Sequence, residues 1–194
     1  MKSNLEQVSA WIRSRQSIYP ASYTGEVIED EVINTLLENA NAAPSHKHTE
    51  PWRFHVIGNS KLKDFGTFCQ KQYAREFTGD RYSQRKYDKI AKKLTVTSHL
   101  IVIGMQRDFN ESVPEWEEIA AVASAVQNIC LSLPAAGIGG YWSSPAYLLN
   151  TVTEFLEMNA GERCLGFLYL GVLNSELPPA ITKKPISDKT KWYN

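Results

Sequence analysis

An uncharged run over residues 119–133 is the feature that most constrains how this chain can fold. Pro114 and the acidic residues that follow it predict a helix start just before the run. The run is apolar almost all the way round, which predicts a central helix buried on most sides. A membrane-spanning helix is the alternative, but Ser124, Gln127 and Pro134 interrupt the pattern and the run stands alone. We therefore expect a core helix and no membrane association.

Length and charge suit one domain over residues 1–194, long enough for a sizeable core. Lysine plus arginine and aspartate plus glutamate number 21 each, so no long-range field would draw the protein onto nucleic acid or an anionic membrane. The three cysteines, Cys69, Cys130 and Cys164, form no C-x-x-C, which argues against a disulfide framework or a zinc site. Since no apolar signal segment opens the chain, a reducing, cytoplasmic location is expected.

Hydrophobic periodicity predicts both helices and strands. A capping box at Ser3 and Glu6 indicates a first helix. Further helices are expected over residues 29–43 and 148–158, and strands over residues 53–57, 98–105 and 163–172. Residues 60–95 read as two polar helices broken at residues 78–80, which we interpret as an exposed lid with a solvated, charged face. A nucleic-acid patch is the alternative, but acidic residues are interspersed among the basic ones. Glycines at 137, 139 and 140 follow a helix, whereas a dinucleotide-binding fingerprint follows a strand and opens a helix. We expect these glycines to let the backbone approach a flat ligand.

The most polar connection, residues 43–52, holds two histidines, a lysine, a threonine and a glutamate between two prolines. A helix-to-strand loop on a rigid scaffold is a common place for a binding site. We predict that it forms one wall of a cofactor site. His46 and His48 could bind a metal, but no third ligand of the right type lies nearby in the sequence, so no metal site is expected.

The exit of the first helix carries Arg13, Ser14, Arg15 and Ser17, whose guanidinium and hydroxyl donors could hold an anion. A solvated basic helix end is the other interpretation. The sequence contains neither a G-x-S-x-G nor an H-E-x-x-H motif. We therefore expect no catalytic side chain, and a bound cofactor that carries the reaction.

Four segments together resemble the FMN-dependent nitroreductase family, especially its compact members, over nearly the whole chain. They are Arg15-Gln16-Ser17-Ile18, then Ala43-Pro44-Ser45 through Pro51-Trp52-Arg53-Phe54, then Gly139-Gly140-Tyr141-Trp142-Ser143-Ser144, and finally Gly166-Phe167-Leu168-Tyr169-Leu170-Gly171 with Lys183-Lys184-Pro185. The resemblance implies an α+β fold in which helices flank a mainly antiparallel central sheet. It also implies a homodimer that exchanges its C-terminal tails, residues 173–194, and holds two FMN sites at the interface.

The resemblance also assigns residues to the FMN. Arg15 and Ser17, with Gln16 between them, would hold the phosphate and ribityl end or the pyrimidine edge. Lys183 or Lys184 would add a cation for the phosphate. His46 would lie beside the flavin, and Glu50 would reach the flavin bound mainly by the other subunit. Tyr141, Trp142 and Ser143 would lie along the ring and offer backbone groups near its reactive edge.

The implied activity is FMN-dependent NAD(P)H oxidoreduction. NADH or NADPH is the electron donor, and a nitroaromatic, quinone or enone-like compound is the acceptor. Donor and acceptor would bind in the same pocket one after the other, which gives ping-pong kinetics. Gln16, His48, Glu50 and Ser143 depart from the residues usual at their positions. A carboxylate near the flavin opposes an anionic reduced ring unless it is paired or protonated. A flavin-binding carrier or sensor without reductase turnover is therefore the alternative.

Overall fold

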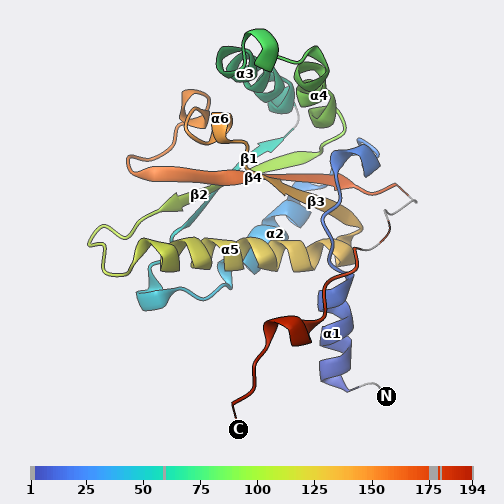
Figure 1. Ribbon diagram of the computed structural model, residues 1–194, viewed down its shortest axis with the longest axis vertical. Helices are drawn as coiled ribbons and strands as arrows, with labels where there is room; N and C mark the ends of the chain where they lie inside the picture. The colour runs from blue at the N-terminus through green and yellow to red at the C-terminus, as the bar shows by residue number, and fades with distance from the viewer. Residues whose placement is uncertain (1–2, 59, 175–178, 180, 194) are drawn as a thin grey trace.

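Four antiparallel strands form a central sheet between two layers of helices (Figure 1). The computed structural model describes residues 3–58, 60–174, 179 and 181–193. The strands are β1 (Trp52–Gly58), β2 (His99–Gln106), β3 (Ile138–Ser143) and β4 (Glu162–Val172), in the order β1-β2-β4-β3. The predicted α+β class and antiparallel sheet are confirmed.

One face of the sheet is covered by α2 (Asp30–Asn41) and α5 (Glu115–Ser132). Strands β2 and β4 are buried on both faces, and their side chains alternate between the two layers. Ile101, Ile103 and Leu168 pack toward α2 and α5. Their neighbours Leu100, Val102 and Phe167 face the opposite layer. The two central strands therefore tie both halves of the core together.

The other face is covered by α3 (Ser60–Glu76), α4 (Gln84–Leu94) and the short α6 (Ala146–Leu149). The two predicted helices of residues 60–95 are confirmed, and a 3-10 turn at Gly79–Arg81 separates them. They bury Leu62, Phe65 and Cys69 against the sheet. This segment is therefore an integral layer of the fold, and its role as a lid stays a prediction.

Two local predictions were wrong. The helix expected over residues 148–158 is only α6 and a 3-10 turn, Val152–Glu154. The β-branched run from Thr151 to Thr153 disfavours helix, and Thr151 Oγ1 donates to the Tyr147 carbonyl, 2.8 Å away. The glycines at 139 and 140 lie in β3, which the sequence analysis did not expect. A Cβ at Gly139 would come within 2.6 Å of the Tyr23 ring, so this glycine accommodates the chain's own side chains; the approach of the glycine backbone to a flat ligand stays a prediction.

Helix α1 (Asn4–Ser14) begins with the predicted capping box: Ser3 Oγ accepts from Glu6 N at 3.3 Å, and the Glu6 carboxylate accepts from Ser3 N at 3.0 Å. No residue of this helix is buried. Leu5, Val8 and Ile12 are all more than half exposed. Exposed apolar side chains on one helix indicate a surface that another element covers.

Helix α5 is less buried in a single chain than its composition predicts. Its inner face packs through Val122, Ala125 and Ile129, whereas Trp116 is 67% exposed and Ile119 is 38% exposed. By length and composition, the segment Glu115–Ala136 could cross a membrane, and no other segment among the described residues meets that test. Here its inner face forms the core under the sheet, and its outer face is uncharged and open beyond the first turn.

Candidate functional site

The residues predicted to hold the phosphate leave α1 beside the C-terminal end of α5. Trp11 Nε1 donates to the Leu131 carbonyl at 2.9 Å, which fixes α1 against that end. Burial raises the pKa of the Cys130 thiol, and the nearby charge of Arg15 opposes that rise. Arg15 and Gln16 are half-buried and Ser17 is exposed. A half-buried arginine and an exposed serine hydroxyl therefore lie at one end of α5.

Strand β3 lies directly against this segment, because Ile18 N donates to the Gly140 carbonyl at 2.9 Å. The ring centroid of Tyr141 is 4.3 Å from that of Tyr19. The structure thus brings two predicted groups together: residues 15–17, and Tyr141, Trp142 and Ser143 that follow Gly140 on the edge strand.

The side chain of Trp142 packs against a β-bulge in β4 that the sequence analysis did not predict. The β2–β4 register shifts between Ile103 and Gly104, so Leu165 is left unpaired in a β-bulge. Next to it, Gly166 has φ +149°, and a Cβ there would come 2.1 Å from Trp142 Nε1. The missing side chain leaves room for the indole, which is 37% exposed. The motif Gly166-Phe167 is visible in the sequence, but the bulge depends on pairing between strands.

The polar loop of residues 43–52 lies at the other end of α5. His46 Nδ1 is 2.5 Å from Glu117 Oε2, in the first turn of that helix. Lys47 Nζ donates to the Ser112 carbonyl at 2.9 Å. Lys47, His48 and Glu50 all have positive φ, between +41° and +54°. Non-glycine residues in this region are strained, and such strain clusters at binding sites.

The loop offers no metal centre. Within the described ranges, no group of three or more histidine, cysteine, aspartate or glutamate side chains is placed to hold a metal ion. The His46 imidazole is engaged with a carboxylate of α5, and the backbone N–H of Glu50 donates to Ser45 Oγ at 3.2 Å. These contacts fix the loop against α5 and present the Glu50 side chain to solvent.

One chain does not bring all the predicted residues to one place. Glu117, which contacts the loop, and Cys130, which lies near Arg15, are at opposite ends of α5. At about 1.5 Å per residue they are roughly 20 Å apart. Arg15 and Tyr141 therefore form one group of predicted site residues, and His46 and Glu50 form another.

Lys183 and Lys184 lie on the C-terminal tail. Residues 181–193 are all exposed, and Figure 1 shows the tail extending beyond the sheet and its helices. Among the described residues, no recorded hydrogen bond or ion pair involves either lysine. The tail also exposes Ile186 and Trp192, at 74% and 84%. The part of the tail that falls on residues 175–178, 180 and 194 lies outside the described residues.

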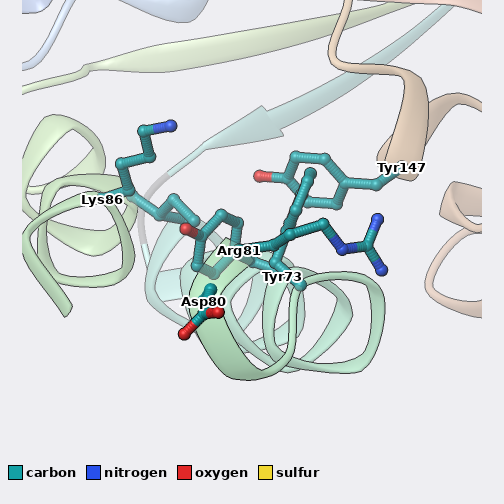
Figure 2. A pocket seen from close by; sticks show the side chains of 7 residues that line it. Tyr73, Asp80, Arg81, Lys86 and Tyr147 are labelled. Carbon is teal, nitrogen blue, oxygen red and sulfur yellow. The ribbon is translucent and has the colours of Figure 1, made fainter. Parts of the chain in front are cut away.

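A pocket of about 580 Å³ opens between α3, α4 and α6, where the sequence analysis expected only a solvated helix face (Figure 2). Its lining residues are Tyr73, Phe77, Asp80, Arg81, Lys86, Ile90 and Tyr147. A signal was available in the spacing of Tyr73 and Phe77, since residues four apart share one face of a helix. Tyr147 could not be added from the sequence, because only the tertiary fold brings α6 to α3.

Comparison with known proteins places this arrangement in a family. A protein of Bacillus subtilis with the provisional name NAD(P)H nitroreductase YfhC is 29% identical over 181 residues, 92% of this chain and 90% of that protein. The iodotyrosine deiodinase of Hydra vulgaris is 25% identical over 86% of this chain and 66% of its own length. The fold also matches a crystal structure of the FMN-dependent nitroreductase NfnB from Mycobacterium smegmatis in complex with NADPH, with a TM-score of 0.78, 14% identity and coverage of 98% and 100%.

The family model described as "Nitroreductase family" matches residues 12–172, which include α5, the whole sheet and both of these groups of predicted site residues. The sequence motifs, the antiparallel sheet and this match agree, and the chain belongs to the nitroreductase family.

Proposed function

We propose that the protein is an FMN-dependent NAD(P)H oxidoreductase that reduces nitroaromatic, quinone or enone-like acceptors by two electrons in a ping-pong cycle. The observation that carries the proposal is the hydrogen bond from Ile18, which directly follows Arg15-Gln16-Ser17, to Gly140 of β3. It attaches an anion-binding segment to a strand along which a flat ring can lie. NfnB, which shares the fold, is FMN-dependent and binds NADPH. Bound FMN would accept electrons from NAD(P)H and pass them to the acceptor.

The residues present suit a flavin nucleotide. Arg15 supplies a permanent positive charge and a planar fork of donors for a phosphate. Beyond Gly140, the backbone of Trp142 and Ser143 lies on an edge strand, whose outward groups are free for a ligand. The indole of Trp142 packs over Gly166 and provides an apolar surface beside this end of the strand. These residues would bind and orient the cofactor, and no side chain needs to donate a proton.

A homodimer would complete the site. Two chains paired through antiparallel α5 helices would bring the loop of one chain to the Arg15 end of the other. The outer face of α5, the apolar side chains of α1 and the exposed tail are the surfaces that such pairing would cover. Obligate dimer interfaces resemble a core cut in half, which fits the apolar character of these surfaces. On this proposal, His46 and Glu50 reach the cofactor held by the partner, and the tail places Lys183 or Lys184 near its phosphate.

The absorbance spectrum of the purified protein tests the function. We expect a yellow flavin spectrum that NADH or NADPH bleaches under anaerobic conditions and that a nitroaromatic or quinone restores. Initial rates at several acceptor concentrations should give parallel double-reciprocal lines. A bound flavin that stays oxidised would favour the carrier or sensor, and colourless protein that takes up no added FMN would contradict both functions.

Arg15→Ala should raise the Kd for FMN by about tenfold or more, because a charge-assisted phosphate contact contributes about 1.5–3 kcal/mol. Quenching of FMN fluorescence on titration measures this affinity. Arg13→Ala is the matched control, since Arg13 is exposed in the last turn of α1 and is not part of the proposed contact. Equal affinity in wild type and Arg15→Ala would remove Arg15 from the phosphate site.

A further inference from the structure

The first turn of α5 contains a fully buried carboxylate, that of Glu118. Its neighbours Glu115 and Glu117 are both partly exposed. Glu118 Oε2 accepts from Arg107 Nε at 2.8 Å, and Oε1 accepts from the backbone N–H of Asp108 at 2.7 Å. A carboxylate is buried only where such partners offset the cost of removing it from water. Both oxygens of Glu118 therefore hold the segment that leaves β2 and leads toward α5.

These contacts fix the loop of residues 107–113, which joins β2 to α5. Arg107 also donates through Nη2 to the Val113 carbonyl at 2.9 Å, so one guanidinium connects the two ends of the loop. Within the loop, the Ser112 N–H donates to Asp108 Oδ2 at 3.0 Å. The loop is thus closed on itself and held against α5, which keeps the Ser112 carbonyl at a defined place.

Lys47 connects this loop to the polar loop that carries the predicted site residues. Its Nζ donates to the Ser112 carbonyl at 2.9 Å. Hydrogen bonds from Ser112, and to a smaller extent the charge of Lys47, lower the pKa of the Asp108 carboxyl, so the ammonium also lies near a carboxylate of the same loop. A series of direct contacts therefore runs from the buried carboxylate of α5, through residues 107–113, to Lys47.

The backbone of the polar loop is strained at the residues that these contacts hold. Lys47 and Glu50 have φ of +52° and +41°. Such conformations persist only where surrounding contacts impose them. His46 is tied to α5 directly through Glu117, and Lys47 is tied to it through residues 107–113. The Glu50 carboxylate is exposed and has no recorded partner in the part of the chain that the structure describes, so its position depends on the backbone of the turn.

We propose that Glu118 is a positioning residue for the proposed flavin site. Acting through Arg107 and Lys47, it sets the conformation in which the turn at residues 47–50 reaches the flavin of the partner chain. This inference rests on the proposed function and names a buried residue on which the second half of that site depends. Glu118 itself lies under the loop and touches no ligand.

Glu118→Gln keeps the size of the side chain and removes the charge that holds Arg107. We expect the Kd for FMN to rise about tenfold, a typical effect within one hydrogen-bonded network. Glu115→Gln is the matched control: Glu115 lies in the same turn and pairs with Arg163 Nη1 at 2.5 Å, but Arg163 belongs to β4 and not to the loop. It should bind FMN as the wild type does. If circular dichroism shows Glu118→Gln unfolded, Arg107→Lys tests the same path with a smaller change.

A double-mutant cycle tests whether Glu118 acts through Lys47. Lys47→Met removes the donor to the Ser112 carbonyl. If both residues act along one path, the double variant should bind FMN no more weakly than the weaker of the two single variants. Combining Glu118→Gln with Arg15→Ala should instead multiply the two fold-changes, because Arg15 belongs to the other group. Independent effects of Glu118 and Lys47, or equal losses in Glu118→Gln and Glu115→Gln, would overturn the proposal.

Hydrogen–deuterium exchange of the turn gives a readout that needs no flavin. In FMN-free protein, the backbone amides of residues 46–50 should exchange faster in Glu118→Gln than in the wild type or Glu115→Gln. A wild type that takes up no FMN would contradict the proposed function, and with it the role of Glu118 at a flavin, even if the exchange is faster. A wild type that binds FMN, with Kd and exchange unchanged in Glu118→Gln, would overturn the positioning role alone.

Discussion

A single charge on the outer face of α5, introduced as Ala123→Glu, is expected to leave the protein monomeric and unable to retain FMN. Ala123 is exposed in one chain and lies on the uncharged face that the proposed homodimer would cover. A carboxylate buried there without a partner costs several kcal/mol. Because each proposed flavin site takes Arg15 from one chain and Glu50 from the other, loss of the dimer would also remove half of every site.

Size-exclusion chromatography with light scattering, together with the flavin-to-protein ratio, measures both effects. Ala74→Glu is the matched control, because Ala74 is exposed on α3 and away from the proposed interface. Circular dichroism should show both variants folded. A dimeric, flavin-loaded Ala123→Glu protein would contradict the interface, and a monomer that still binds FMN tightly would contradict a shared site.

The sheet was largely predictable from the sequence because three of its strands carry strong apolar runs. β2 and β4 are buried on both faces, which leaves a continuous pattern such as His99 to Met105 in β2. β3 escaped prediction because Gly139 and Gly140 have low strand propensity. Their place is decided by Tyr23, Ile18 and Leu133, which pack where side chains would otherwise be. Such contacts between distant segments leave no periodic signal.

The candidate site was predictable as a set of motifs but not as a geometry. The segments that carry Arg15 and Tyr141 are far apart in sequence and are joined by the hydrogen bond of Ile18 to Gly140. The loop around His46 was expected beside them, yet in one chain it contacts Glu117 at the far end of α5. Spacing along a chain cannot show which residues face a symmetry-related copy. The aromatic pocket was missed for a related reason: the charges around it resemble a solvated helix face until α6 is packed beside them.

Phe65→Ala should lower the free energy of unfolding by about 4 kcal/mol, a typical cost of deleting a fully buried aromatic ring. Phe65 is 0% exposed, and its ring centroid lies 5.2 Å from that of Phe155 and 5.8 Å from that of Phe167 in β4. Urea denaturation measures the effect, at equal protein and FMN concentrations because bound ligand adds its own stability. Phe109→Ala is the control: its side chain is 98% exposed, and a change within about 0.5 kcal/mol is expected.

The size of the Phe65 effect decides what kind of lid residues 60–95 can form. A large loss means that α3 cannot lift from the sheet without exposing its core, so any opening over the pocket would be confined to the turn at Gly79–Arg81 and the side chains around it. Arg81 lies in that turn and Lys86 follows it in α4, so small movements there would open or close that side of the pocket while its aromatic side chains stay fixed. A loss below about 1 kcal/mol, well under the usual range for a buried phenylalanine, would instead indicate a loosely attached layer that can swing away as a whole.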